Sequence, residues 1–139
     1  MFTSDINANR RKASRTSLIY LIVSLFCALF GAVYEMFSHE VYSYYMIYAF
    51  AFPLIGGTLL FQIIAVIGVN KHPNHFACKL YHSGIAALTV GSIVRGVLDI
   101  YGTTNALAEY YWIIGVCGVL FGIGIETTIR LYCYFSHTN

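Results

Sequence analysis

The chain has 139 residues, of which 58% are hydrophobic and 10% are charged, and its formal net charge is +2. Soluble globular domains usually contain about 25% charged residues, so this composition excludes a water-soluble domain and predicts an integral membrane protein. One helical crossing of a bilayer needs about 20 apolar residues. The length therefore accommodates one domain of four helices with short connections.

The chain begins with a basic segment, residues 1–16, which we expect to form a cytoplasmic tail. It contains Arg10, Arg11, Lys12 and Arg15 and stands directly before an apolar run. Signal peptides share this order, but the run is longer than their apolar core and lacks a small-residue cleavage site at its end. We therefore expect the run to be retained as a transmembrane helix.

Each of the apolar segments that follow is long enough to cross a bilayer as a helix. They cover residues 17–38, 42–69, 77–102 and 110–135, and a short tail, 136–139, ends the chain. The second segment is long enough to tilt or to bend at Pro53. The predicted fold class is all-α, a polytopic four-transmembrane-helix bundle made of two helical hairpins. The connections are too short to hold a soluble active site.

The distribution of basic residues predicts the orientation, because loops with Lys and Arg stay in the cytoplasm. With the N-terminus inside, only Arg95 lies toward the outer face, and all other basic residues fall on or near the inner face: Arg10, Arg11, Lys12, Arg15, Lys71, Lys79 and Arg130. We expect both termini to be cytoplasmic and the protein to lie in the plasma membrane.

Small residues recur every four positions on three of the predicted helices, and each series ends in a charged residue. The series are Cys27, Gly31 and Glu35; Ala87, Gly91 and Arg95; and Gly118, Gly122 and Glu126. Residues four apart share a helix face, and small residues let helices approach closely in a membrane. We expect these glycines to pack helices together and the charges to face protein rather than lipid.

A charge that faces hydrocarbon costs several kcal/mol, so each intramembrane charge needs a partner. Glu35 and Arg95 fall in the outer third of their predicted helices, and Asp99 follows Arg95 by one turn. We predict an outer cluster of Glu35, Arg95 and Asp99. The alternative interpretation is an ion pair that only fixes the register of the helices.

Toward the inner face, Glu126 and Arg130 have the spacing and order of a favourable helical ion pair. His82 lies at a similar predicted depth to Glu126. Because an imidazole titrates near neutral pH, a contact between the two would form a proton-titrating pair. The alternative is a buried histidine bonded to a backbone carbonyl.

Metal and cofactor patterns are weak. Glu35 and His39 share the end of the first predicted helix and are the best candidates for a divalent cation, but such a pair at a rim is more typical of a solvated surface, and we predict no metal site. A buried haem needs two histidines facing each other at one depth, whereas only His82 is clearly inside a helix. We predict no cofactor, with haem possible only through His82 residues paired across a dimer.

Motifs of enzymes are absent: the sequence has no CxxC, nucleotide-binding loop or hydrolase motif. This favours a protein that is not an enzyme, with no catalytic residue and no nucleic-acid partner. An enzyme that uses scattered intramembrane polar residues remains an alternative.

Two functions fit these features. The first is a small transport or ligand-binding bundle in which Glu126, His82 and the predicted outer cluster line a polar path; four helices enclose little volume, so it would be a homo-oligomer. The second is a non-catalytic accessory subunit whose glycine faces dock another membrane protein. A haem-binding electron-transfer protein is a third and lesser alternative. The lipid bilayer is a partner in every case.

Overall fold

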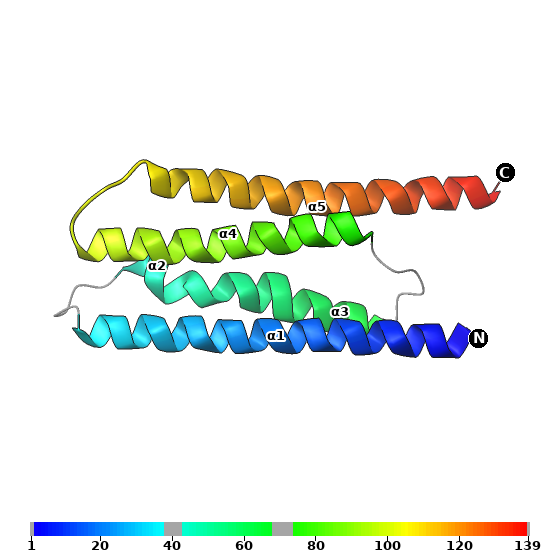
Figure 1. Cartoon of the computed structure of the whole chain (residues 1–139), viewed down its shortest axis with the longest axis horizontal. Coiled ribbons are helices and arrows are strands. Elements are labelled where there is room, and N and C mark those ends of the chain that lie inside the picture. The colour runs from blue at the N-terminus through cyan, green and yellow to red at the C-terminus, as the bar shows by residue number, and fades with distance from the viewer. Residues whose placement is uncertain (1, 38–42, 68–73, 139) are drawn as a thin grey trace.

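The computed structural model describes residues 2–37, 43–67 and 74–138. Within these residues all regular secondary structure is helical, and four helices are long and apolar enough to span a membrane. The predictions of an all-helical fold and of four helices long and apolar enough to cross a membrane are therefore confirmed. The long helices run side by side, and the start of α1 lies at the same end of the molecule as the end of α5 (Figure 1). We call this the terminal end, and the other the opposite end.

The first helix, α1, runs without a break from Phe2 to Phe37. The basic stretch expected as a tail is thus the first part of a long helix. One reason is local: proline and glycine, the residues that disfavour a helical backbone most strongly, do not occur before Gly31. A hydrogen bond also holds this stretch against α3 (Leu60–Ile67): Nε of Arg10 donates to the carbonyl of Ala65 at 2.9 Å.

One face of α1 is marked by Ser17, Ser24 and Gly31, which are spaced seven residues apart and are all buried. The Ser17 hydroxyl donates to the carbonyl of Thr58 at 3.1 Å, and the Ser24 hydroxyl to that of Phe50 at 3.2 Å. Small hydroxyl residues permit close approach and bond across helices in a membrane. This face therefore packs along the next span.

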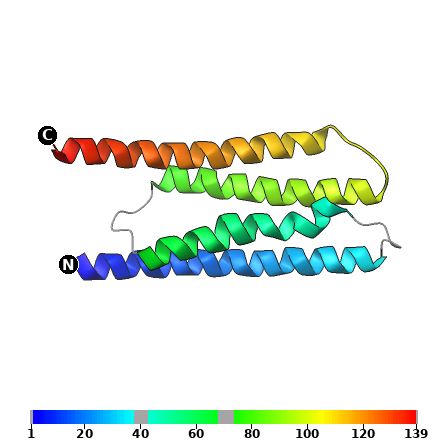
Figure 2. The ribbon, with the colours of Figure 1, turned by 180° about the vertical axis from the view of Figure 1, so that it is seen from behind.

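The second span, Tyr44–Ile67, changes its helix type along its length. It consists of α2 (Tyr44–Ile47), a 3₁₀ turn (Tyr48–Phe50), a π-helical segment (Phe52–Leu59) and α3 (Leu60–Ile67). Pro53 has no N–H and cannot complete the usual helical bond. A wider π turn is a known response to such an interruption. As a result α2 lies beside α4, whereas α3 lies beside α1 (Figures 1 and 2).

The last two helices, α4 (His75–Ile100) and α5 (Leu107–Thr138), form the most extensive contact of the structure. Glycine makes it possible: a methyl group added at Gly84 would lie 2.6 Å from the backbone nitrogen of Val119. The turn between the helices uses Gly102 at φ 68°, a conformation that favours glycine. At the terminal end both α1 and α5 continue beyond α3 and α4 (Figure 2).

The bundle has two sides: α1 packed with the second span, and α4 packed with α5. These sides meet differently at the two ends. At the opposite end Met46, only 1% exposed, lies between α1 and α4: a methyl group added at Gly96 would approach its Cβ to 2.8 Å, and one at Gly31 its carbonyl oxygen to 3.3 Å. Toward the terminal end α4 has few contacts with α3. The two sides are thus closely packed at one end and joined by fewer groups at the other.

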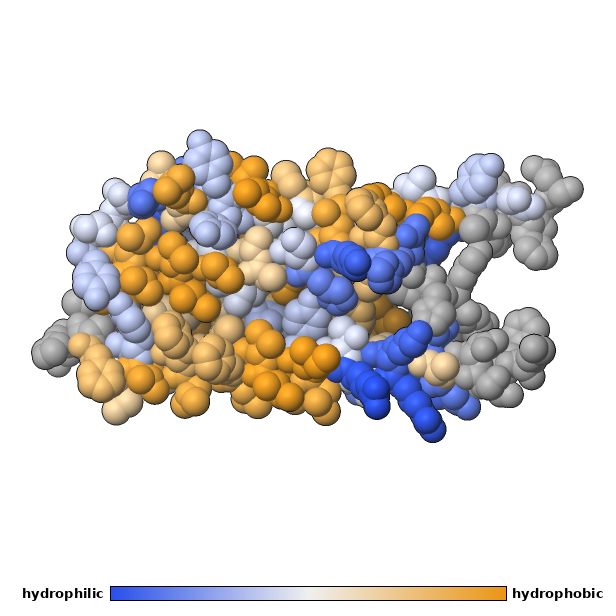
Figure 3. Space-filling view, in the orientation of Figure 1, coloured by the Kyte–Doolittle hydropathy of each residue, from blue (hydrophilic) through white to orange (hydrophobic). Residues whose placement is uncertain are grey.

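Hydrophobic side chains cover most of the length of the molecule, and strongly hydrophilic ones gather toward the terminal end (Figure 3). Large apolar residues are exposed along α1 and α5, among them Leu25 at 63% and Phe121 at 63%. A surface of this kind is stable only against lipid or another apolar surface.

We predict that Gly84→Ala destabilises the protein by about 1–3 kcal/mol, because the added methyl group would overlap the backbone of α5 and force the helices apart. The matched control is Gly124→Ala on α5, where an added methyl group meets no atom within 4 Å. Unfolding in detergent micelles, followed by circular dichroism, measures both variants. Equal stability of the two would contradict the close α4–α5 packing.

Candidate functional site

Four aromatic rings from three helices gather inside the membrane span toward the terminal end. Tyr20 comes from α1, Phe61 from α3, and Tyr81 and His82 from α4; we call them the ring cluster. Phe61 stacks on His82 with 5.2 Å between ring centroids, and Tyr20 stacks on Phe61 at 6.0 Å. Tyr81 meets Phe61 edge-on at 6.3 Å. The cluster joins the two sides of the bundle where α3 and α4 have few direct contacts.

The π-helical segment positions two of these rings. A side chain at Gly57 would overlap the ring of Tyr20, so glycine there leaves the space that the ring occupies. The carbonyl of Gly56 accepts a hydrogen bond of 2.6 Å from the hydroxyl of Tyr81. Backbone that departs from the α-helix at membrane depth is tolerated where other protein groups bond to its polar atoms. The segment around Pro53 thus creates both a notch and an acceptor for side chains of α1 and α4.

His82 has a partner at each ring nitrogen. The Tyr20 hydroxyl lies 2.5 Å from Nδ1, and Sγ of Cys78 lies 3.4 Å from Nε2. One neutral tautomer satisfies both: the hydroxyl donates to Nδ1, and the N–H at Nε2 donates to the sulfur. His82 follows the start of α4 by seven residues, which is about 10 Å along the axis. It is therefore a titratable group inside a span and in contact with two helices.

Glu126 and His82, expected to form a pair, have other partners in the structure. Oε1 of Glu126 accepts from Nε of Arg130 at 2.7 Å, and Oε2 accepts from the backbone N–H of Asn74 at 2.8 Å. Asn74 is the N-cap of α4, so the carboxylate lies where the helix dipole favours a negative charge.

The depth of Glu126 explains why the sequence suggests a different partner. Counted from the end of α5, the residue lies well inside a helix. However, α5 extends beyond the start of α4 at the terminal end (Figure 1). Glu126 is consequently level with Asn74, the residue before α4, and its side chain is 22% exposed. It lies at the rim of the bundle rather than at depth.

Arg95 lies among acidic and aromatic groups at the opposite end. Its ion pairs are with Asp99, at 3.8 Å, and with Glu109, at 3.9 Å, and its guanidinium carbon lies 5.4 Å from the centroid of the Tyr45 ring. Asp99 also accepts a hydrogen bond of 3.1 Å from the Ser43 hydroxyl. The Arg95 and Asp99 side chains are 31% and 35% exposed, so these pairs are long, partly solvated and weak.

Two of the three residues of the predicted outer cluster are neighbours in the structure. Arg95 and Asp99 do lie together, and Glu109 is an additional member that the sequence did not single out because it appeared to be a solvated residue at a helix start. Glu35 is half-buried near the end of α1 and makes contacts of its own, but the ion pairs of Arg95 are with the other two acids.

The metal and haem alternatives involve Glu35, His39 and His82. His39 lies outside the described residues. Among the residues that are described, no three His, Cys, Asp or Glu side chains are arranged to hold a metal ion. Any ligation of a haem by His82 would require it to release Tyr20 or Cys78, its present partners.

The glycines expected to pack helices lie at contacts between elements. A methyl group added at Gly91 would lie 2.7 Å from Cβ of Tyr111. One added at Gly118 would lie 3.0 Å from Cα of Gly84, and one at Gly122 would lie 2.9 Å from Cβ of Tyr81. Gly31 faces the carbonyl of Met46, as described above. Three of these glycines therefore permit the close α4–α5 contact, and Gly31 permits the close approach of Met46 to α1.

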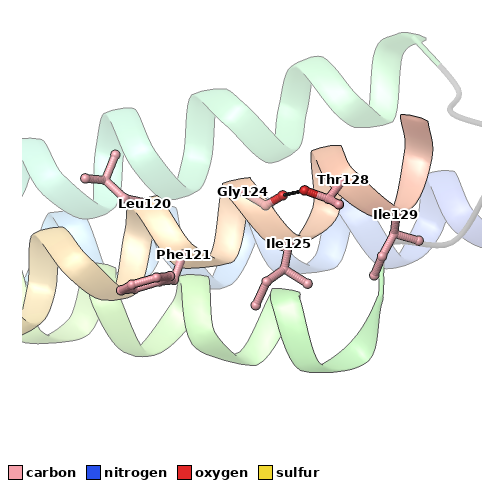
Figure 4. Close-up of a pocket in the computed structure, with 6 residues that line it drawn as sticks. All are labelled: Leu120, Phe121, Gly124, Ile125, Thr128 and Ile129. Atoms are coloured by element: carbon pink, nitrogen blue, oxygen red, sulfur yellow. Dashed lines mark hydrogen bonds between the residues drawn. The ribbon is translucent and has the colours of Figure 1, made fainter. Parts of the chain in front are cut away.

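A shallow groove lies on the exposed face of α5 (Figure 4). Its lining consists of Leu120, Phe121, Gly124, Ile125, Thr128 and Ile129. The Thr128 hydroxyl donates to the carbonyl of Gly124 at 2.8 Å, so its one polar side chain is satisfied within the helix. The groove is apolar and offers no chemistry of its own.

The sequence matches no family model, no curated protein and no solved structure. Its function must therefore be inferred from the site. Sequence reasoning identified His82 but missed Tyr20 as its partner. The seven-residue spacing of Ser17, Ser24 and Gly31 defines the packed face of α1, and Tyr20, three positions after Ser17, falls on it.

We predict that Glu126→Gln destabilises the protein by about 1 kcal/mol, because it removes the charge that pairs with Arg130 and faces the N-terminus of α4. Glu109→Gln is the matched control, since that side chain is 71% exposed and should tolerate the change. Detergent-micelle unfolding compares them. If both variants are as stable as the unmodified protein, the carboxylate of Glu126 does not support the start of α4.

Proposed function

We propose that this protein is a small membrane transport or ligand-binding bundle that responds to protons, and that His82 is the residue that gains and loses the proton. The helices would be organised as two hairpins, α1 with the second span and α4 with α5. One observation carries the proposal: a titratable side chain inside a span is bonded across to another helix, at the Tyr20–His82 contact of 2.5 Å. Intramembrane ionisable residues of this kind are typical of functional sites.

The chemistry of the contact supports a proton response. Neutral His82 accepts from the Tyr20 hydroxyl at Nδ1. Once protonated, both ring nitrogens donate, so the hydroxyl must become the acceptor and turn its own proton elsewhere. Protonation thus reverses a bond that joins α1 to α4. The bond to Tyr20 persists with its direction reversed, but the hydroxyl proton needs a new acceptor and the ring now carries a charge inside the span. Because few contacts between α3 and α4 support the same region, we expect the rearrangement to affect the terminal end, while the packing around Met46 holds the opposite end.

A route for the proton starts at the terminal end. Glu126 is at the rim and bonds to Asn74 at the start of α4. Cys78, one turn further along that helix, lies 3.4 Å from Nε2 of His82. In this proposal Glu126 and Arg130 form the entrance, and the ring cluster is the proton-binding site. Arg95, Asp99 and Glu109, with Glu35 on α1, form the polar rim at the opposite end.

We propose that both termini face the cytoplasm and that the protein lies in the plasma membrane. The basic side chains support this orientation: Arg11, Lys12, Arg15, Lys79 and Arg130 are on the elements of the terminal end and are exposed, while Arg95 is at the opposite end. Excess positive charge marks the cytoplasmic side of membrane proteins.

The proton site is tested by nuclear magnetic resonance of protein labelled with ¹⁵N-histidine in micelles, with His82→Gln to assign its signals. We expect the His82 ring to gain a proton reversibly as the pH is lowered, and Tyr20→Phe to shift the midpoint of this titration. The matched control is Tyr48→Phe, a tyrosine that is 60% exposed. A His82 that keeps one protonation state throughout would contradict the proposal.

Transport itself is tested in liposomes that enclose a pH-sensitive dye. We expect the protein to dissipate an imposed pH gradient faster than protein-free liposomes, and His82→Gln to return the rate to that of the lipid alone. A protein whose His82 titrates without any proton flux would be a pH-sensitive ligand-binding bundle rather than a proton transporter.

The second candidate function is a non-catalytic subunit of a larger membrane complex. The exposed apolar face of α5, along which the groove runs, favours it because another membrane protein could cover that face. Cys117 is exposed on this helix and shares the face of Phe121 and Gly124, which follow it by four and seven residues. This natural cysteine can report whether a second copy covers the groove.

We predict that a variant with Cys117 as its sole cysteine forms a disulfide-linked dimer in membranes treated with a mild oxidant, because a homo-oligomer would bring two α5 helices together. The control retains only Cys27, which is buried and should not cross-link. If Cys117 stays monomeric and the protein instead co-purifies with a stoichiometric neighbour, the accessory-subunit function replaces the homo-oligomer.

A further inference from the structure

We infer that the terminal end of α1 binds the phosphate headgroups of anionic phospholipids through Arg11, Lys12 and Arg15. This site is distinct from the ring cluster. It depends on the proposed membrane location, but not on proton binding or transport.

The rotation of α1 directs these side chains outward. On the packed side, Arg10 donates from Nε to the carbonyl of Ala65 at 2.9 Å and from a terminal nitrogen to that of Val66 at 3.3 Å. Ser17 continues this side with its bond to Thr58. Arg10 therefore belongs to the fold, and the basic residues that follow it are turned away from the second span.

On the outward side, the basic residues continue a lipid-facing stripe. Arg11, Arg15, Leu18, Ile22 and Leu25 are spaced by three or four residues and so share one helix face. The three apolar members are 58%, 57% and 63% exposed. A face that exposes such residues along a membrane span contacts acyl chains, so its basic continuation meets the headgroups of the same lipids.

The distances along α1 fit this arrangement. At a rise of 1.5 Å per residue, Arg15 lies about 4.5 Å and Arg11 about 10 Å from Leu18 along the axis. The headgroup layer on each side of a bilayer is roughly 5–8 Å thick, and basic side chains are long enough to reach across it. One phospholipid can therefore place its phosphate at Arg11 and Arg15 and an acyl chain along Leu18 and Ile22.

The charges on this face are available to a ligand. Arg11, Lys12 and Arg15 are exposed, and within the described residues their side chains make no ion pair or hydrogen bond. Residues 6–34 contain four basic side chains and no acidic one. Figure 3 shows the hydrophilic side chains gathered beside the hydrophobic band at this end. Arg130 differs, because Glu126 already pairs with it.

A phospholipid fits better than a soluble anion. A free phosphate gains only the charge contacts, which salt screens. A phospholipid gains the same contacts and also covers the exposed stripe of leucine and isoleucine. Juxtamembrane clusters of basic residues are known to select anionic lipids.

Native mass spectrometry of the full chain in detergent tests the inference, with phosphatidylglycerol and phosphatidylcholine offered in equal amounts. We expect preferential retention of phosphatidylglycerol, falling roughly fivefold for each charge removed by Arg11→Gln, Lys12→Gln and Arg15→Gln. The combination Arg11→Lys, Lys12→Arg and Arg15→Lys keeps the charge and should keep the preference. Circular dichroism verifies that each variant is folded.

Three outcomes overturn the inference: no preference in the unmodified protein, an equal loss from Lys79→Gln on α4, or displacement of the lipid by excess inorganic phosphate. The second would indicate general attraction rather than a site on α1, and the third a soluble anion. The His82 titration should be unchanged in the folded triple variant. Failure of the lipid site is therefore separable from failure of the proton site.

Discussion

The carbonyl groups of the second span are the feature on which the rest of the structure depends. In hydrocarbon, every backbone polar group needs a protein partner, and the interruption at Pro53 disturbs the regular helical bonding of this span. Its neighbours supply side-chain donors instead. Ser24 and Ser17 of α1 bond to Phe50 and Thr58, and Tyr81 of α4 bonds to Gly56. Arg10 of α1 bonds to the carbonyl of Ala65 in the last turn of α3, where carbonyl groups have no partner within the helix. These bonds fix the rotation of α1 and bring Tyr20 to His82.

The same need for bonding partners distinguishes charged side chains that stabilise the fold from His82, the side chain proposed to bind a proton. Arg10 satisfies carbonyls at the end of α3, and Glu126 satisfies the start of α4 together with Arg130. Arg95 shares two acids and a ring near the opposite end. Each of these charges is near an end of the bundle. His82 differs because it is about 10 Å inside α4. The side chains beside its two ring nitrogens, Tyr20 and Cys78, can exchange donor and acceptor roles.

Composition and hydropathy were sufficient to predict an all-helical protein with four membrane-length helices, because the bilayer restricts the possible structures so strongly. The partners of the polar residues were harder to predict. The sequence places Glu126 deep in the last helix, and only the offset between α4 and α5 shows that it is level with Asn74. Likewise Glu109 follows a turn whose path decides that it meets Arg95. Such pairings depend on the offset and rotation of helices, which a single sequence does not specify.

Some of the missing information was nevertheless present in the sequence. Four-residue spacing of small residues draws attention to Gly31, but the seven-residue spacing of Ser17, Ser24 and Gly31 identifies the whole packed face of α1. Once that face is known, Arg10, seven residues before Ser17, falls on it, and Arg11 and Arg15 must point away from the second span. Anchoring of that outward face by headgroups would hold α1 and the second span in place. The contact between Tyr20 and His82 joins this anchored pair to the second pair, α4 and α5, and the two pairs pack together chiefly at Met46. A change of protonation at His82 would therefore act mainly on the position of α4 and α5.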